Sequence, residues 1–196
     1  MENEKKFGTK QIAITAVLLA ICIISQVFKN LSVFITGPII NACIALAVLM
    51  VNLPCGIILS IITPITAYFI ASSPIMSAVP AMILFIMLGN VVLAVMTHVL
   101  IKKPLKSAGG NLFTVPNIIK AVIASLAKGV FMGLTISLWL LPTFIPADSP
   151  LRGRLPIFQR TFSLYQFLTA CIGFVYVFII YAALRKSETN FQKSDS

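Results

Sequence analysis

Long apolar runs separated by short polar segments dominate this sequence. A helix needs about 20 mostly apolar residues to cross the hydrocarbon core of a bilayer, which is about 30 Å thick. Six runs reach or approach that length, and they lie at residues 11–28, 35–51, 55–72, 80–101, 117–141 and 162–184. The pattern therefore predicts an all-α integral membrane protein with six transmembrane helices.

The second and third runs leave an alternative open. Both are short, and only Asn52, Leu53 and Pro54 separate them, so they could form one bent hydrophobic hairpin instead of two spans. Pro64 lies inside the third run. Because proline has no amide hydrogen, we expect a kink there and a backbone carbonyl freed near the middle of the membrane.

Composition excludes most soluble classes of protein. Residues of the AVILMFWYC set make up 59% of the chain, charged residues make up 10%, and the mean hydropathy is +1.01. A soluble domain carries about 25% charged residues. The net charge of +10 does not predict a nucleic-acid partner, because the basic residues cluster between apolar runs and not along one polar face. The distribution is typical of membrane topology.

The basic residues also predict an orientation. An even number of spans places both termini on one side of the membrane. With the termini inside, nine basic residues lie in inner segments, namely Lys5, Lys6, Lys10, Lys102, Lys103, Lys106, Arg185, Lys186 and Lys193. Only four lie in outer segments, namely Lys29, Arg152, Arg154 and Arg160. The positive-inside rule then predicts cytoplasmic termini, with tails at residues 1–9 and 187–196 flanking a membrane domain at residues 10–186.

Two connections differ in character. Residues 102–116 contain a Lys-Ser-Ala-Gly-Gly-Asn stretch, which predicts a flexible cytoplasmic connector. Residues 142–161 carry four prolines and the three outer arginines. Long ordered loops in compact domains are often functional, so we expect this outer loop to act as a lid.

Lys128 is the most unusual residue in the predicted spans. It lies close to the middle of the fifth helix, where a lysine costs at least about 2.5–3.5 kcal/mol on insertion scales. None of the six spans contains Asp or Glu, so no acidic side chain within the membrane can pair with it. Two interpretations remain open. Lys128 snorkels or donates to backbone carbonyls, such as one freed near Pro64, or its partner is an anionic ligand.

Other polar residues gather at the same depth or closer to the outer face. Asn90 falls near the midplane, Asn41 lies in the second helix, and Gln26 lies near an outer helix end. Buried amides bridge helices as readily as they bind ligands. A polar cavity that opens outward would explain the distribution, and the candidate substrate-binding residues are Asn41, Asn90, Lys128, Trp139, Arg152, Arg160, Tyr165 and Gln166.

Small residues form two stripes at helical spacing. Ala121, Ser125, Gly129 and Gly133 recur every four residues on the fifth predicted helix, and Ala16 and Ala20 form a similar pair on the first. Such stripes allow two helix backbones to approach closely. Packing within the chain is the simplest interpretation of the longer stripe.

Catalytic and metal-binding patterns are absent from the sequence. It contains no GxSxG, HExxH or P-loop motif and no paired acids, so we expect neither an enzyme nor an ATP-driven pump in one chain. The cysteines Cys22, Cys43, Cys55 and Cys171 have no metal-ligand spacing, which predicts free thiols. No cofactor and no metal are expected.

Several segments resemble one family of membrane proteins. These segments are Lys-Gln-Ile-Ala-Ile-Thr-Ala-Val-Leu-Leu-Ala at residues 10–20, Thr-Gly-Pro-Ile-Ile-Asn at 36–41, Thr-Pro-Ile-Thr-Ala at 63–67 and Met-Leu-Gly-Asn at 87–90. Together with the size and the six-helix pattern, they resemble the substrate-binding S components of energy-coupling factor (ECF) transporters, which import micronutrients into bacteria and archaea.

The resemblance implies a location and partners. It implies a multi-pass protein of the cytoplasmic membrane that works with an ECF module, composed of one membrane T subunit and two cytoplasmic ATPases. In that family, small residues on the first helix meet the T subunit, and Ala16 and Ala20 match by position. The family binds its ligand near the outer face, beneath connections that correspond here to residues 29–34, 73–79 and 142–161.

Two functional hypotheses follow. The first is a membrane subunit that captures a small, anionic micronutrient, such as a vitamin or its precursor, at the outer face. Lys128 and the outer arginines would meet the acidic group, and Trp139 or Tyr165 would contact any ring. The alternative is a membrane assembly or sensor subunit without transport activity, in which the polar residues only hold helices together.

Overall fold

The computed structural model describes residues 8–28, 32–103 and 112–194, with the backbone alone for residues 185–194. All regular secondary structure within these ranges is helical. Six helical segments are long and apolar enough to cross a membrane, and they are Thr9–Val27, Val33–Val51, Leu53–Ala71, Met82–Lys102, Val115–Phe144 and Pro150–Leu184. The predicted all-α fold with six spans is therefore confirmed.

The first three spans show whether the second and third apolar runs form two helices or one bent hairpin. They consist of α1 (Thr9–Val27), α2 (Val33–Leu46) with its π-helical continuation η1 (Ala47–Val51), and α3 (Leu53–Ala71). Asn52 between η1 and α3 is extended, with φ at −160°, and its Oδ1 accepts a hydrogen bond from the Cys55 amide at 2.9 Å. An asparagine in this geometry caps a new helix. The two runs are therefore separate spans and not one bent hairpin.

The second half of the chain contains more helix than expected. Its elements are α4 (Pro74–Ala78), α5 (Met82–Thr97), η2 (His98–Lys102), α7 (Val115–Met132), η3 (Gly133–Leu140), α8 (Leu141–Phe144), η4 (Pro150–Arg154), α9 (Leu155–Phe162) and α10 (Leu164–Ser194). The last helix continues through most of the predicted C-terminal tail. The predicted flexible part of residues 102–116 falls mainly on residues 104–111, outside the described residues, as do residues 1–7 of the N-terminal tail.

The connection at residues 142–161 is a helical hairpin and not the loop expected from its prolines. Pro150 and Pro156 each lie in the first turn of a helix, where the missing amide hydrogen costs little, and Pro142 lies near the end of the continuous span Val115–Phe144. Two reciprocal hydrogen bonds of 2.9 Å hold α9 against η3, because Ser137 Oγ donates to the Gln159 carbonyl and Gln159 Nε2 donates to the Ser137 carbonyl.

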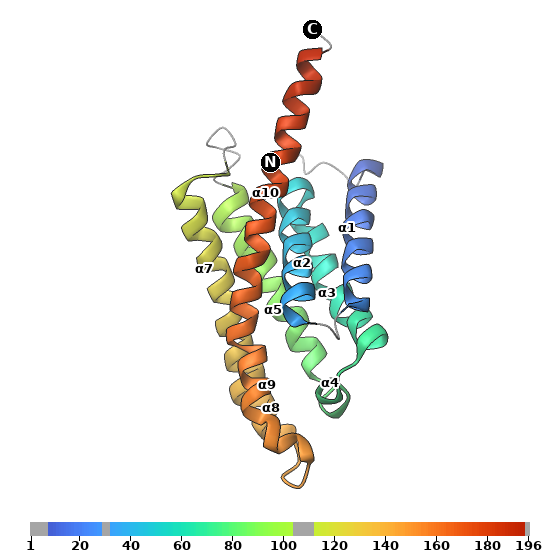
Figure 1. Cartoon of the computed structure of the whole chain (residues 1–196), viewed down its shortest axis with the longest axis vertical. Helices are drawn as coiled ribbons and strands as arrows, with labels where there is room; N and C mark the ends of the chain where they lie inside the picture. The colour runs from blue at the N-terminus through green and yellow to red at the C-terminus, as the bar shows by residue number, and fades with distance from the viewer. Residues whose placement is uncertain (1–7, 29–31, 104–111, 195–196) are drawn as a thin grey trace.

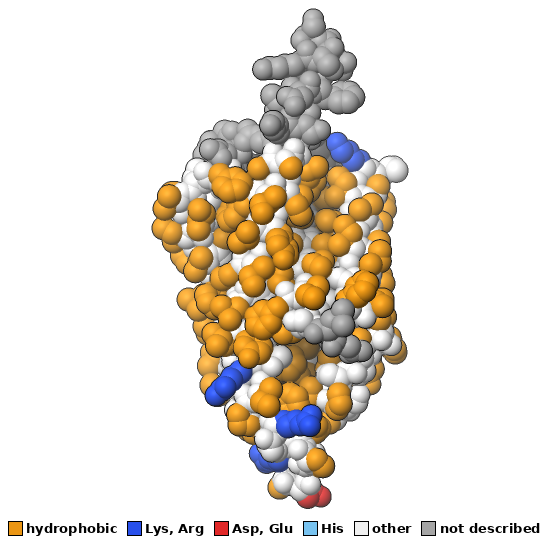
Figure 2. Space-filling model, viewed as in Figure 1, with side chains coloured by type: hydrophobic (Ala, Val, Ile, Leu, Met, Phe, Trp, Pro, Cys, Tyr) orange, Lys and Arg blue, Asp and Glu red, His pale blue; other side chains and the backbone are white. Residues whose placement is uncertain are grey.

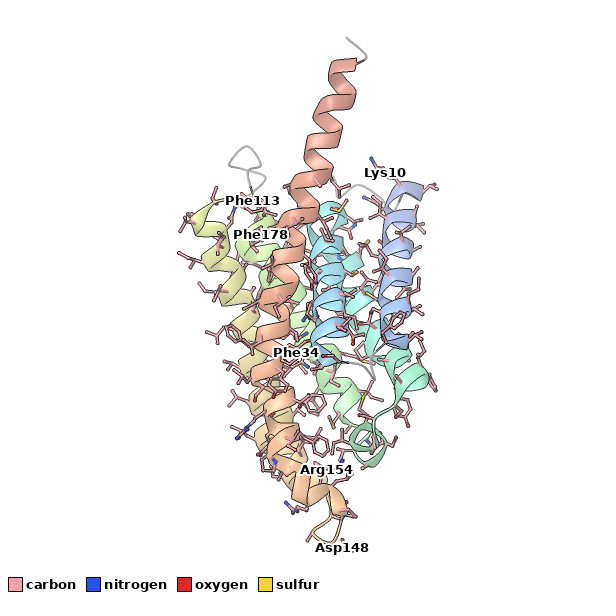
Figure 3. The ribbon with its side chains drawn as sticks, in the orientation of Figure 1. Lys10, Phe34, Phe113, Asp148, Arg154 and Phe178 are labelled. Carbon is pink, nitrogen blue, oxygen red and sulfur yellow. The ribbon has the colours of Figure 1, made fainter. Side chains whose placement is uncertain are left out.

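Both chain ends lie at the same end of the bundle (Figure 1). The start of α1 and the far end of α10 lie there, whereas α4, α8 and α9 lie at the opposite end, which we call the α9 end. Lys10 marks the first end, and Asp148 and Arg154 mark the α9 end (Figure 3). On the visible face, hydrophobic side chains cover the middle of the molecule and Lys and Arg side chains lie near its ends (Figure 2). This distribution fits a bundle that spans a membrane.

The interior consists of two hydrophobic clusters with a polar layer between them. One cluster includes Leu93 and Ala124, and the other, toward the α9 end, includes Met82 and Met132. Asn90 lies between Met82 and Leu93 along α5, and Lys128 lies between Ala124 and Met132 along α7. The sequence thus places Asn90 and Lys128 at one level of the bundle, between the two clusters.

The stripe on α7 packs within the chain, as the simplest interpretation predicted. A Cβ atom added to Gly129 would lie 2.8 Å from Phe167 Cβ and 3.3 Å from Phe167 Cα, so α7 and α10 are in near backbone contact. Gly173 plays the same part between α10 and α2, because a Cβ there would lie 2.9 Å from Asn41 Cβ and 3.0 Å from the Pro38 carbonyl. Small residues at these positions bring the polar level of α2, α7 and α10 together.

The Gly129 contact can be tested with a matched pair of glycine variants. Gly129→Ala should lower the free energy of unfolding by about 1–2 kcal/mol, because the neighbouring atoms are the Cβ, Cα and N of Phe167, whose positions are fixed by the α10 backbone. Gly153→Ala is the control, since no atom lies within 4 Å of its added Cβ. Unfolding of both variants in detergent gives the comparison, and equal stability would contradict the close approach.

Candidate functional site

Three buried side chains converge at the polar level of the bundle. Lys128 is only 2% exposed, and its Nζ donates hydrogen bonds to Asn41 Oδ1 at 2.6 Å and to Asn90 Oδ1 at 2.7 Å. The three residues come from α7, α2 and α5. Hydrogen bonds that involve a charged donor are short and strong, and these lengths fit that class. One ammonium group therefore links three helices.

A fourth helix joins through Asn41. Its Nδ2 donates to Thr169 Oγ1 on α10 at 3.4 Å, and Thr169 Oγ1 donates to the Gln166 carbonyl at 3.2 Å. Because Lys128 occupies Oδ1 of both asparagines, the orientation of each amide is determined by the network. The amide nitrogen of Asn41 thereby points to α10.

These contacts correct one interpretation of Lys128 from the sequence. Its partners are side-chain amide oxygens, and not backbone carbonyls near Pro64. Pro64 itself lies within the continuous helix α3. The sequence placed Asn41, Asn90 and Lys128 at similar depth, and the structure brings them into direct contact.

Among the described side chains, no carboxylate pairs with the charge of Lys128. The five acidic residues of the chain are at positions 2, 4, 148, 188 and 195, all outside the six spans. An ammonium group has three N–H donors, and two of them are used by the asparagines. Within the described part of the chain, neither the third N–H of Lys128 nor Nδ2 of Asn90 has a hydrogen-bond acceptor. The polar level thus contains donors without acceptors.

A cavity of about 310 Å³ adjoins these donors. Asn41, Asn90 and Lys128 line it together with residues from α1, α3, α4, α9 and the start of α10, so it lies in the half of the bundle toward the α9 end (Figure 1). Most of its wall is apolar and includes Ile40, Ile75, Met76, Ile86, Phe158 and Phe162. Pockets for small molecules have this character, with apolar walls and a few placed polar groups.

The structure brings four of the eight predicted binding residues to the cavity. Gln166 lines it beside Asn41, Asn90 and Lys128. The other four are Trp139, Arg152, Arg160 and Tyr165, which are not among its lining residues.

Each of these four residues has a different environment. Trp139 is 51% exposed, and its ring lies 5.7 Å from that of Phe85 and 6.1 Å from that of Phe144, measured between centroids. The Tyr165 ring packs against Phe34 with centroids 5.0 Å apart. Arg160 is exposed on α9 and Arg152 is half-buried in η4. Helix α9 lines the cavity through Ile157, Phe158 and Thr161, whereas Arg160 on the same helix is exposed and does not line it.

Gln26 is a lining residue that the sequence did not single out as a binding residue. It lies in the last turn of α1, is completely buried, and its Nε2 donates to the Thr63 carbonyl on α3 at 2.9 Å. The signal in the sequence was an amide near the outer end of an apolar helix, which is also compatible with simple helix bridging.

The predicted partner surface on α1 faces outward. Ala16 and Ala20 are both exposed, together with the neighbouring Val17 and Ile21. This face does not contribute to packing within the chain, so lipid or another protein can contact it.

Metal-ligand clusters of at least three His, Cys, Asp or Glu residues are absent from the part of the chain that the structure describes. Its four cysteines are free thiols, as the sequence predicted. Comparison of the chain with protein families, with curated proteins and with solved structures gives no significant match.

The asparagine–lysine network makes a prediction about stability. Asn41→Leu should lower the free energy of unfolding by about 1.5–3 kcal/mol, because it removes a hydrogen bond to a buried charge. In a Lys128→Met background the same substitution should cost clearly less, since the charge is gone. A double-mutant cycle of unfolding in detergent measures this coupling.

Thr97→Val provides the control for this cycle. Thr97 is also fully buried, but its hydroxyl donates to Leu93 of its own helix at 2.7 Å. It should show no coupling to Lys128→Met. An Asn41→Leu cost that stays the same in both backgrounds would mean that the network contributes nothing to stability.

Proposed function

We propose that this chain is a substrate-binding membrane subunit that captures a small molecule in the cavity beside Lys128. The observation that carries this proposal is the pairing of an apolar cavity with unused donors on Lys128 and Asn90. A buried positive charge without an acidic partner is costly. An anionic group on a bound molecule would supply the missing charge and accept the remaining hydrogen bonds.

The lining of the cavity limits the class of molecule. Among the lining residues that the structure describes, Lys128 is the single charged one, so the site favours one negative charge over several. The apolar wall favours a body of aliphatic or aromatic groups. We therefore propose a small micronutrient with a mostly apolar body and one carboxylate or similar acidic group, as in some vitamins and their precursors.

The direction of capture follows from the positive-inside rule. In the sequence, nine basic residues fall in segments on the same side of the six spans as the termini and four fall in segments on the other side, so we place the termini in the cytoplasm. The cavity then lies in the outer half of the membrane. This position suits uptake of a scarce molecule from outside a bacterial or archaeal cell.

The chain contains no nucleotide-binding motif, so transport against a gradient needs an external source of energy. On the strength of the resemblance to ECF S components, we propose a membrane T subunit with two cytoplasmic ATPases as that source. The exposed face of Ala16 and Ala20 on α1 is available for such a partner. The role proposed for this chain is binding and not catalysis.

One observation favours a second candidate. The two asparagine oxygens already bind Lys128, and the network joins α2, α5, α7 and α10. A membrane assembly or sensor subunit would need this network only to hold its helices. In that case the cavity would contain lipid tails or water and no specific molecule.

Retention of a bound molecule separates the two candidates. Native mass spectrometry of the protein purified from its source cells should detect a bound small molecule. Lys128→Met should lower the bound fraction by about 10-fold or more, since a hydrogen bond to a charge contributes about 1.5–3 kcal/mol. Lys120→Met is the matched control on the same helix, and it should retain the molecule because Lys120 does not line the cavity.

Two outcomes would contradict the binding proposal. Purified protein that shows no bound molecule, and no thermal stabilisation by a panel of vitamins and other small monocarboxylates, would favour the assembly candidate. Equal retention in the Lys128→Met and Lys120→Met variants would remove Lys128 from the binding site.

The partner proposal has its own test. Ala16→Trp combined with Ala20→Trp should abolish copurification with the T subunit and ATPases, because bulky side chains prevent close approach of two helices. Val122→Trp, at an exposed position on α7, is the control and should leave copurification intact. Undiminished copurification of the alanine variant would exclude this face as the interface.

A further inference from the structure

The acceptor oxygen of Gln26 has no role in the Lys128 network. Gln26 Nε2 donates to the Thr63 carbonyl at 2.9 Å, and this contact determines the orientation of the amide, since the reverse would bring two oxygens together. Within the described part of the chain, Oε1 has no hydrogen-bond partner. The side chain is 0% exposed and lines the cavity.

An unpartnered buried acceptor needs an explanation. Buried polar side-chain atoms almost always have a partner, because leaving one without costs about 1–3 kcal/mol. Burial prevents bulk solvent from reaching Gln26. The cavity that Gln26 lines can supply such a partner, as part of a bound molecule or as a trapped water.

Gln26 and Lys128 line the cavity from different helices. Gln26 belongs to α1 and Lys128 to α7, and these helices lie on opposite sides of the view in Figure 1. The unused donors of Lys128 and Asn90 are on the α5 and α7 side, whereas the unused acceptor is on the α1 and α3 side. A molecule that fills the cavity would meet donors at one end and an acceptor at the other.

We propose that Gln26 is a specificity-determining residue that accepts a hydrogen bond from an N–H or O–H group of the bound molecule. This inference rests on the proposed function and narrows the substrate class. The molecule carries an acidic group at Lys128 and Asn90, an apolar middle, and a separate donor at its other end. A site built around such a hydrogen bond rejects analogues that lack the donor.

The experiment uses the molecule found by native mass spectrometry as its probe. After extraction, its exchangeable hydrogens are counted by mass spectrometry in D₂O, and a derivative is made by methylating the N–H or O–H farthest from the acidic group. Calorimetry then measures the affinity of both compounds for the wild-type protein and for two variants, Gln26→Met and Gln26→Glu.

The two variants isolate the acceptor oxygen. Gln26→Met removes both Nε2 and the acceptor oxygen, whereas Gln26→Glu keeps an acceptor oxygen at this position. Methylation should weaken binding to the wild type by about 10-fold or more. This loss of affinity on methylation should be as large for Gln26→Glu as for the wild type, and it should fall to less than about 3-fold for Gln26→Met. For each protein the affinity of the methylated compound is divided by that of the unmethylated one. General effects of the substitution on folding or affinity cancel in this ratio.

Each contrary outcome has a distinct meaning. If methylation weakens binding to Gln26→Met as much as to the wild type, the effect is steric and the assignment is overturned. A bound molecule without a second donor would also overturn it. No penalty in the wild type would mean that a trapped water only satisfies Oε1. These results leave the proposed function in place, whereas a protein that binds no molecule contradicts the proposed function itself.

Discussion

A buried ammonium group without a carboxylate to pair with it is the constraint around which this bundle is arranged. Lys128 lies in the middle of a span that is surrounded by hydrocarbon. Two amide oxygens of the chain accept its hydrogen bonds in place of an acidic side chain. Those amides must come from α2 and α5, so the positions of three helices depend on one group. Gly129 and Gly173 permit the close helix contacts that make this possible, since a side chain at either position would separate α7 or α2 from α10.

The same arrangement explains why a cavity lies beside the network. Toward the chain termini, a continuous hydrophobic cluster fills the interior. Toward the α9 end, the wall includes the short helices α4 and α9, which pack over the space between the longer spans. The two amide hydrogen bonds offset only part of the free-energy cost of burying the ammonium group. Because two hydrogen bonds of Lys128 are already made, the site can remain folded without a ligand. Binding of an anion would still stabilise it further.

The sequence predicted the large features because they depend on simple physical rules. Six apolar runs were enough to predict six helices, and Asn52 before Pro54 contained the capping signal that separates the second helix from the third. Lys128, Asn41 and Asn90 could be found because polar groups in hydrocarbon are costly wherever they lie. Their direct contact could not be derived, because it depends on how α2, α5 and α7 rotate and pack.

Some binding residues predicted from the sequence do not line the cavity, and one lining residue was not predicted. Prolines usually mark loops, so the sequence predicts a lid that contains Arg152 and Arg160, but Pro150 and Pro156 start helices here and neither arginine lines the cavity. Trp139 points outward against Phe85, as interfacial aromatics do. Gln26 required knowledge of its neighbours, since only the contact with Thr63 shows that one oxygen remains without a partner.

A density map of the protein purified from its native membrane, at a resolution that shows side chains, tests the central claim most directly. We expect non-protein density in the cavity, with an acceptor atom about 2.7–2.9 Å from Lys128 Nζ. A cavity filled by the protein's own hydrocarbon side chains, or an Nζ turned away toward lipid headgroups, would contradict it.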